Sequence, residues 1–249
     1  MTEEGCLLID NSNTRTKLML CRPGAEVEVR ILPTAEISHE SLSQGLSGWS
    51  FERVCLCSVV PWAAKVIADC VGDVEFHQMD VESATGVDFS TYPGRATLGA
   101  DRVANVLAAV QRVPLPLVAV DLGTAATFDV VVQGEHGPVF SGGIIAPGLS
   151  AVAGSLANAT AMLPAVEMNA DGPIIGRTTQ EAMSAAVRVG YPGMVDALLS
   201  GIESELGRPV HVVLTGGDAA SLAPSLHHQS VIVPLLTFEG IALVAGVNI

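Results

Sequence analysis

The sequence has few aromatic residues and few charges. Phenylalanine, tryptophan and tyrosine make up 4% of its 249 residues, and the four charged residue types make up 15%. The scarcity of aromatic rings argues against a protein that binds single-stranded nucleic acid by base stacking. The low charge and a hydrophobic content of 49% exclude a disordered chain and indicate a well-packed globular protein.

Basic residues are in short supply. Twelve lysines and arginines stand against 26 aspartates and glutamates, which gives a formal net charge of −14 at pH 7. A protein with this net negative charge is not attracted by charge to nucleic acid or to anionic membranes, which are negative themselves. We therefore expect no nucleic-acid partner and no membrane partner. A ligand that carries phosphate must be held by backbone N–H groups, a metal ion or individual basic side chains.

The patterns of secreted, membrane and zinc proteins are also missing. No apolar run reaches the roughly 18 residues that span a bilayer, and the acidic start Met1-Thr2-Glu3-Glu4 does not resemble a signal peptide. The five cysteines are odd in number, and Cys55-Leu56-Cys57 lacks the spacing of a zinc-ligand pair. We interpret them as reduced core residues, so we expect a cytoplasmic protein.

Neither of the two commonest nucleotide motifs, Walker A and the Rossmann glycine pattern, is present. Instead, turn-forming segments follow apolar runs at residues 11–14, 123–124 and 215–218. The first two of these turns come after an aspartate at the tip of a predicted strand, Asp10 and Asp121. Each turn alone is also what an ordinary strand connection needs. Together they favour a protein whose exposed backbone N–H groups bind phosphate oxygens.

The pattern of the first 32 residues recurs in the second half. A strand ending at Asp10, a tight turn and two further strands are predicted, and residues 117–141 repeat this order with a first strand ending at Asp121. Such a duplication indicates an internal structural repeat. Pro114 and Pro116 interrupt the chain between the copies. The predicted halves are residues 1–115 and 116–249.

Other segments predict the elements around these hairpins. Apolar runs predict a strand over residues 54–60 and a helix over residues 62–71. Thr178 and Glu181 have the spacing of a capping box, which predicts a long helix from there to about Leu206. We expect this helix to be kinked or split, because Gly190, Pro192 and Gly193 lie inside it.

An acid and a base lie side by side in Leu98-Gly99-Ala100-Asp101-Arg102, where a polar loop becomes an apolar helix. An aspartate at a helix start is ordinary capping chemistry. The alternative is phosphoryl transfer, in which Asp101 accepts a proton and Arg102 binds an anionic group of the substrate. In that chemistry Asp10 can hold Mg²⁺. The candidate phosphate donors are Asn13, Thr14 and Lys17, although Lys17 is explained equally well as a solvated strand residue.

Taken together, these motifs resemble the type III pantothenate kinases of the acetate kinase/sugar kinase/heat-shock ATPase/actin superfamily, over nearly the whole chain. The run Asp10-Asn11-Ser12-Asn13-Thr14 resembles the family's first phosphate motif, D-x-G-N-T, and Gly99-Ala100-Asp101-Arg102 resembles its G-x-D-R substrate motif. Residues 121–127, 142–148, 176–183 and 215–219 resemble later family segments. The resemblance implies an α/β protein with a duplicated ribonuclease H-like (actin-like ATPase) fold. Two mixed β-sheets flanked by helices would carry the active site in the cleft between the halves.

The resemblance also implies the activity, which is ATP-dependent phosphorylation of the primary hydroxyl of pantothenate in the first step of coenzyme A synthesis. Asp101 would be the catalytic proton acceptor, ATP would come with Mg²⁺ near Asp10, and Asp121 would bind potassium or ammonium. Thr124 would contact ATP, and Thr179 would contact pantothenate from the partner subunit of a homodimer. The remaining implied contacts are Asp10, Asn11, Ser12, Asn13, Thr14, Arg15, Thr16 and Lys17 for ATP, and Tyr92, Gly99, Ala100, Asp101 and Arg102 for pantothenate.

The sequence departs from the family pattern in a few places. Ser12 stands where the family has glycine, which would cost about 1 kcal/mol if the backbone there needed a positive φ. Asn11 is unusually polar for its position. The segment between Tyr92 and Gly99 lacks the Asn-Pro often found there, and Arg95 can serve as an anion contact instead. Because of Ser12, a non-catalytic regulator or ligand sensor stays open as an alternative, as does a kinase for another small hydroxylated acid.

Overall fold

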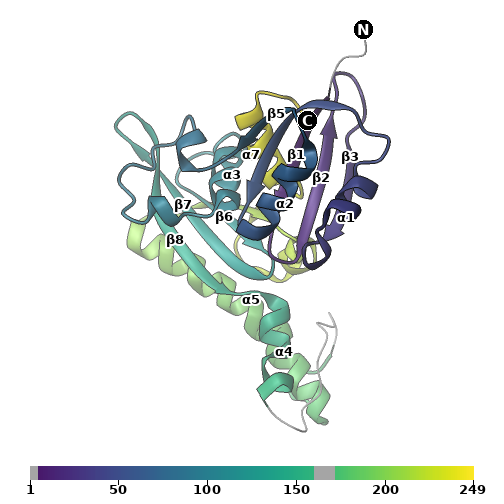
Figure 1. The fold of residues 1–249 in the computed structure, drawn as a ribbon. Coiled ribbons are helices and arrows are strands. Elements are labelled where there is room, and N and C mark those ends of the chain that lie inside the picture. Colours follow the sequence, from purple (N-terminus) through teal and green to yellow (C-terminus); the bar gives the residue numbers. More distant parts are fainter. Residues whose placement is uncertain (1–4, 160–171) are drawn as a thin grey trace. The chain divides into compact units, whose positions relative to one another are not determined.

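The computed structural model describes residues 5–159 and 172–249 (Figure 1). They pack as two compact units. The first unit takes in the described residues up to Arg112 together with Val132–Ser141 and Leu235–Ile249. The second takes in Val113–Val131 and the described residues of Gly142–Pro234.

The first sheet confirms the predicted N-terminal meander. Its five strands lie in the order β3-β2-β1-β4-β5 (Figure 1). Strand β1 pairs antiparallel with β2 and parallel with β4, β2 pairs antiparallel with β3, and β4 pairs parallel with β5. The strands are β1 (Gly5–Asn11), β2 (Arg15–Cys21), β3 (Glu28–Pro33), β4 (Phe51–Ser58) and β5 (Glu75–Gln78).

The second sheet repeats this order. Read from its meander side it runs β8-β7-β6-β9-β10, and β6 pairs antiparallel with β7 and parallel with β9, as β1 does with its neighbours. The strands are β6 (Leu117–Leu122), β7 (Ala125–Gly134), β8 (Gly137–Pro147), β9 (His211–Thr215) and β10 (Ser230–Ile232). Two mixed sheets with one strand order, flanked by helices, are the duplicated ribonuclease H-like fold that was predicted. Strand β8 continues beyond residue 141, where the predicted repeat ends, because the glycines at 142 and 143 keep the N–H and C=O groups that form a ladder.

The helices of the first unit are α1 (His39–Gly45), α2 (Pro61–Val71), α3 (Ala100–Ala109) and α7 (Leu236–Ala245), and those of the second are α4 (Leu149–Ala159), α5 (Thr179–Leu206) and α6 (Ala219–Leu222). Helix α5 is unbroken over 28 residues, so the expected split at Pro192 is wrong (Figure 1). Tyr191, Val195 and Leu199 are buried along it. Burial of three large side chains outweighs the roughly 3 kcal/mol that an internal proline costs a helix. Within the described ranges, no helix has both the length and the apolarity to cross a membrane.

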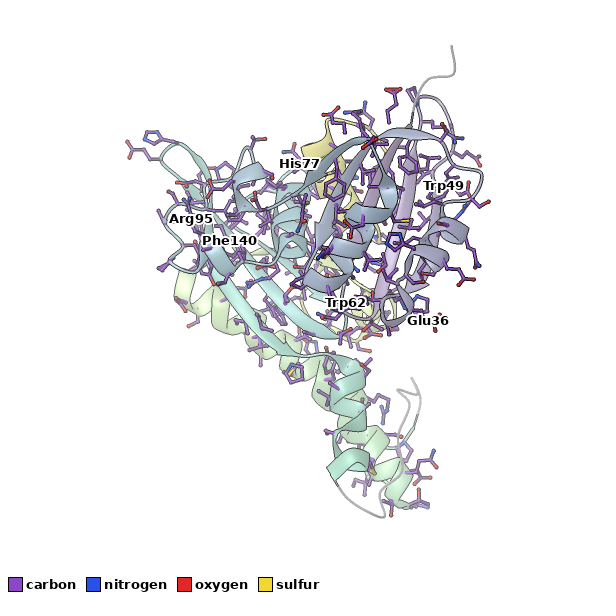
Figure 2. All side chains as sticks on the ribbon, viewed as in Figure 1. Glu36, Trp49, Trp62, His77, Arg95 and Phe140 are labelled. Atoms are coloured by element: carbon purple, nitrogen blue, oxygen red, sulfur yellow. The ribbon has the colours of Figure 1, made fainter. Side chains whose placement is uncertain are left out.

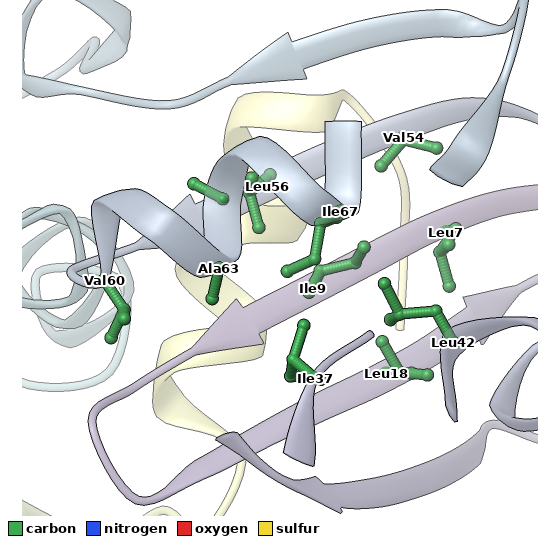
Figure 3. Packing of buried hydrophobic residues seen from close by; sticks show 11 residues of the cluster. Leu7, Ile9, Leu18, Ile37, Leu42, Val54, Leu56, Val60, Ala63 and Ile67 are labelled. Atoms are coloured by element: carbon green, nitrogen blue, oxygen red, sulfur yellow. The ribbon is translucent and has the colours of Figure 1, made fainter. Parts of the chain in front are cut away.

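Alternation along β1 decides which face each of its side chains occupies. Leu7 and Ile9 point into a core formed with α1 and α2. Figure 3 shows the members of this core, which include Leu7, Ile9, Leu18, Ile37, Leu42, Val54, Leu56, Val60, Ala63 and Ile67. Because successive strand residues face opposite sides, Leu8 and Asp10 point to the other face, where α3 and α7 pack. Helix α3 carries Asp101, so the pattern of β1 directs Asp10 toward the second predicted acid.

Helix α7 packs closely against α3. A Cβ at Gly240 would collide with the backbone of Ala104, so the two helices approach closely there. The Thr237 hydroxyl donates a hydrogen bond of 2.8 Å to Asn105 Oδ1, and both side chains are buried. This contact joins the last helix of the chain to the one that carries Asp101.

Candidate active site

Asp10 and Lys17 form an ion pair at the end of the first hairpin. They are directly opposite in the β1–β2 register, and Lys17 Nζ lies 2.7 Å from Asp10 Oδ2. The other carboxylate oxygen, Oδ1, accepts a hydrogen bond of 2.9 Å from the Ser12 hydroxyl. The carboxylate of Asp10 is therefore oriented at both oxygens, and only 2% of the side chain is exposed.

Ser12 fits the hairpin without strain. Among the residues that the structure describes, positive φ angles occur at glycines alone, so Ser12 does not use the left-handed region. Its N–H donates to the carbonyl of Arg15 at 3.1 Å, which closes the turn. The cost of about 1 kcal/mol considered for a serine here does not arise. The residue gives the turn a hydroxyl that a glycine would lack.

The polar side chain of Asn11 is explained by a buried network. Its Nδ2 donates to Thr16 Oγ1 at 2.7 Å, and its Oδ1 accepts from the Ser58 hydroxyl at 2.6 Å. The Thr34 hydroxyl lies 3.0 Å from Thr16 Oγ1 and donates to the carbonyl of Ser12 at 2.7 Å. These hydrogen bonds fix the buried side of the turn and connect it to Ser58 at the end of β4.

The tip of the turn points outward. Asn13, Thr14 and Arg15 are exposed, while Asn11 and Thr16 are buried in the network. The backbone groups and side chains at the tip are thus accessible to a ligand. Ser58 and Thr34 were not predicted as site residues, because only the folded sheet brings them to the turn.

Asp101 lies in the first turn of α3 with its carboxylate turned back toward the helix start. Its Oδ1 accepts a hydrogen bond of 2.8 Å from the N–H of Arg102. Burial is the main cause that raises the pKa of Asp101, and the negative charge of Asp10 raises it further. The N–H and the guanidinium of Arg102 act in the opposite direction. A carboxylate with a raised pKa is a better proton acceptor than an ordinary one near neutral pH.

Cys57 lies beside both acids. It pairs with Asp10 in the β1–β4 register and is 1% exposed. Burial raises the pKa of its thiol well above the usual value, and the charges of Asp10 and Asp101 add to the effect. The thiol is therefore protonated, and it presents an uncharged surface to the two carboxylates. Sequence reasoning treated it as a core cysteine, and strand register is the signal that it adjoins the site.

Tyr92 and Arg102 come together on one aromatic ring, that of Phe140 in β8. The rings of Tyr92 and Phe140 are 5.0 Å apart at an interplanar angle of 85°. The guanidinium carbon of Arg102 lies 5.9 Å from the centre of the Phe140 ring. Arg95, which Figure 2 labels, lies on the same loop as Tyr92 and pairs with Glu82. Phe140 was not predicted as a site residue.

In the second unit, three predicted segments meet near Asp121. Gly216 has φ +93°, and a Cβ there would lie 2.5 Å from Asp121 Oδ1. The N–H of Asp218 donates to the carbonyl of Leu122 at 3.1 Å, and that of Gly148 donates to the carbonyl of Thr124 at 3.2 Å. Only glycine allows the 215–218 turn to approach the carboxylate so closely. Thr124 is exposed beside it.

Thr178 caps the long helix α5, as its capping-box spacing predicts. The Thr178 hydroxyl accepts the N–H of Glu181 at 3.1 Å and caps α5. Glu181 reaches back to the N–H of Arg177, one residue earlier than in the usual capping box. Thr179 is exposed in the first turn and is not the cap.

The donor set suits a magnesium ion that is shared with phosphate. No group of three histidine, cysteine, aspartate or glutamate side chains able to hold a metal occurs in the described part of the chain. Mg²⁺ usually takes one or two protein carboxylates and completes its shell with phosphate oxygens and water. Asp10, oriented at both oxygens, can supply such a carboxylate.

Comparison with known proteins matches the chain to one family. Residues 6–200 match the profile of the type III pantothenate kinase family. The chain is 40% identical over 247 residues to the type III pantothenate kinase of Akkermansia muciniphila, covering 98% of this chain and 99% of that protein. It is 37% identical to that of Methylacidiphilum infernorum, covering 98% of this chain and 89% of that protein.

Solved structures support the fold. A Baf family transcriptional activator from Campylobacter jejuni aligns with a TM-score of 0.59 at 20% identity, covering 96% of this chain and 97% of that one. The ethanolamine utilization protein EutJ from Carboxydothermus hydrogenoformans aligns with a TM-score of 0.58 at 12% identity, covering 96% and 89%. At such identities the similarity extends to the fold alone.

Proposed function

The chain belongs to the type III pantothenate kinase family, and from this we propose that it transfers the γ-phosphoryl group of ATP to the primary hydroxyl of pantothenate. This is the first step of coenzyme A biosynthesis. The observation that carries the proposal is the 40% identity to a kinase of that family over nearly the full length of both chains. The acids predicted for the reaction, Asp10 and Asp101, interact electrostatically in the fold.

Asp101 is the proton acceptor in this proposal. Its pKa is raised by burial and by Asp10, so its affinity for a proton is closer to what a base needs at neutral pH. In phosphoryl transfer the protein mainly positions the reactants and offsets charge. Asp101 would therefore orient the pantothenate hydroxyl and take its proton as the new P–O bond forms.

The first hairpin binds the nucleotide phosphates. Asp10 would hold Mg²⁺, which when bound offsets the charge of the phosphate oxygens. Lys17, whose side chain is 35% exposed, can turn from Asp10 to a phosphate once Mg²⁺ takes its place as the partner of the buried carboxylate. The exposed tip residues, Asn13, Thr14 and Arg15, would add N–H and side-chain donors.

Pantothenate carries a carboxylate at the end opposite its primary hydroxyl. Arg102 offers the planar set of donors that matches a carboxylate. Tyr92 would contact the same molecule from the neighbouring loop, and Gly99 and Ala100 would line the approach to Asp101. The close contact of Tyr92 and Arg102 with one ring supports a shared role.

We also propose cation and nucleotide contacts for residues of the second half of the chain. We assign Asp121 to a potassium or ammonium ion and Thr124 to ATP. The surroundings of Gly216 support this, because a Cβ there would lie 2.5 Å from both Asp121 Oδ1 and the carbonyl oxygen of Leu122, and oxygen atoms of these two kinds are ligands of hard cations. Omission of potassium and ammonium should lower turnover, and Asp121→Ala should remove that dependence.

We further propose the duplicated halves 1–115 and 116–249, a homodimer, and a cytoplasmic location. Each half contains one complete sheet of matching strand order. Ile174 and Ile175 are 65% and 81% exposed just before α5, which an apolar subunit contact would cover. Thr179 follows them and would reach the partner's pantothenate. The five cysteines have free thiols, as is usual in a reducing compartment.

A kinase assay tests the function directly. ADP formation is coupled to NADH oxidation with purified protein, ATP, Mg²⁺, potassium and pantothenate, and the product is identified by mass spectrometry. We expect ADP release that requires pantothenate and yields 4′-phosphopantothenate. Absence of turnover would support a regulator or sensor, and turnover of other hydroxylated acids but not of pantothenate would change the substrate.

A further inference from the structure

Phe140 joins two residues that are proposed to bind the substrate. The side chain is fully buried, at 0% exposure, on strand β8 (Figure 2). Tyr92 packs against it edge-on at 5.0 Å between ring centroids, and the Arg102 guanidinium lies 5.9 Å from the ring centre. One ring thus contacts both the loop before α3 and the first turn of α3.

The backbone of β8 secures the same loop. The N–H of Phe140 donates to the carbonyl of Asp88 at 3.0 Å, and the N–H of Asp88 donates to the carbonyl of Pro138 at 2.8 Å. These bonds extend the edge of the strand onto the loop a few residues before Tyr92. Backbone pairing fixes the loop along the strand, and the ring of Phe140 fixes the side chains above it.

The chemistry of the three groups favours a defined arrangement. Aromatic rings prefer edge-to-face contacts, and a guanidinium is attracted to the face of a ring. A buried ring cannot itself touch the substrate. Its effect must pass through Tyr92 and Arg102, whose side chains are partly exposed.

We infer that Phe140 is a positioning residue for pantothenate: it sets the placement of Tyr92 relative to Arg102, and so controls affinity for pantothenate without affecting the use of ATP. This inference rests on the proposed function, since it assumes that Tyr92 and Arg102 bind pantothenate. The carboxylate of Asp101 accepts the backbone N–H of Arg102, whereas Phe140 faces the guanidinium of Arg102, so proton transfer should depend little on Phe140.

The test compares Phe140→Leu with Phe89→Leu. Phe89 is 5% exposed, and its ring lies 5.3 Å from that of Phe140, so its loss removes similar packing but leaves Phe140 on Tyr92 and Arg102. In Phe140→Leu we expect the KM for pantothenate to rise about tenfold, with kcat and the KM for ATP within about twofold of wild type. In Phe89→Leu all three should stay within about twofold. An equal rise in both variants, or no rise in Phe140→Leu, would overturn the inference.

A second measurement needs no substrate and keeps the inference testable if Phe140→Leu folds poorly. Urea unfolding is followed for Phe140→Leu, Arg102→Met and the double variant, with the milder Phe140→Met replacing Phe140→Leu if that variant does not fold. We expect the two sites to be coupled by about two- to fivefold in the unfolding equilibrium constant. Additive effects would contradict the contact. If the wild-type protein does not turn over pantothenate, the proposed function is refuted instead, whatever the coupling measured between Phe140 and Arg102.

Discussion

The carboxylate of Asp101 occupies the space that a side chain at Gly99 would need. A Cβ built on Gly99 would lie 2.5 Å from Asp101 Oδ1, well inside van der Waals contact. Gly99 has an ordinary φ of −60°, so the glycine serves the position of the carboxylate and not the backbone conformation. The G-x-D spacing therefore has a direct steric reason in this chain.

Gly99→Ala should displace Asp101 and lower kcat by about 100-fold, because a shift of about 1 Å in a reacting group costs that much. The fold should survive, since the clash is with the end of one side chain. Steady-state kinetics and thermal unfolding check this. Gly201→Ala is the matched control, because nothing lies within 4 Å of a Cβ there, and its kcat should equal that of wild type. Unchanged turnover in Gly99→Ala would show that the carboxylate can move without consequence.

Asp101→Asn should lower kcat by about 100- to 10,000-fold, the usual contribution of a positioned proton acceptor. In the wild type, kcat/KM should fall on the acid side as Asp101 becomes protonated. Because its pKa is raised, this fall should occur above the ordinary aspartate value of 3.8. A pH profile of kcat/KM from pH 4 to 9 measures it. An acid limb that persists unchanged in the residual activity of Asp101→Asn would assign it to another group.

The same substitution should stabilise the protein at neutral pH. A group whose pKa is raised on folding contributes stability below its unfolded pKa and loses that contribution as pH rises through the folded pKa. The advantage of Asp101→Asn over wild type should therefore grow as pH rises from 3.8 through the raised pKa and then level off. Urea unfolding at several pH values tests this. A constant difference across pH would show that the pKa of Asp101 is the same in both states.

Ser12→Ala should weaken the use of MgATP, because Asp10 Oδ1 loses its 2.9 Å hydrogen bond. We expect kcat/KM for ATP to fall about tenfold, near the lower end for hydrogen bonds to charged groups, since water can partly replace the hydroxyl. Ser12→Thr keeps the hydroxyl and should stay near wild type. ATP titrations at saturating pantothenate give both values. Equal kinetics for Ser12→Ala and wild type would show that the serine hydroxyl has no role in the use of ATP.

Gly240→Ala should separate α7 from α3, because the added methyl group collides with the backbone of Ala104. We expect a loss of about 1–3 kcal/mol in the free energy of unfolding, as in other overpacked cores. Gly190→Ala, in a helical site where nothing lies within 4 Å, is the control and should be neutral or stabilising. Denaturant unfolding measures both. Equal stability of the two variants would mean that α7 can shift without cost.

The local order of the chain could be predicted from the sequence by itself. Continuous apolar runs ending at Asp10 and Asp121, each followed by turn-forming residues, predicted both hairpins, and the repeat predicted a duplicated fold. Thr178 predicted the start of α5 because capping depends on neighbouring residues. Such features depend on periodicity and on contacts within a few residues.

Only the tertiary structure decided the surroundings of these motifs. Phe140 contacts Tyr92 and Arg102 from a distant strand, and the partners of Asn11 include Ser58 from β4. Cys57 adjoins the acids because of a strand register that no local pattern predicts. The unbroken α5 likewise depends on burial along its length. Packing between distant segments determines these features. A single sequence shows which residues are present, but it does not show which distant residues come into contact.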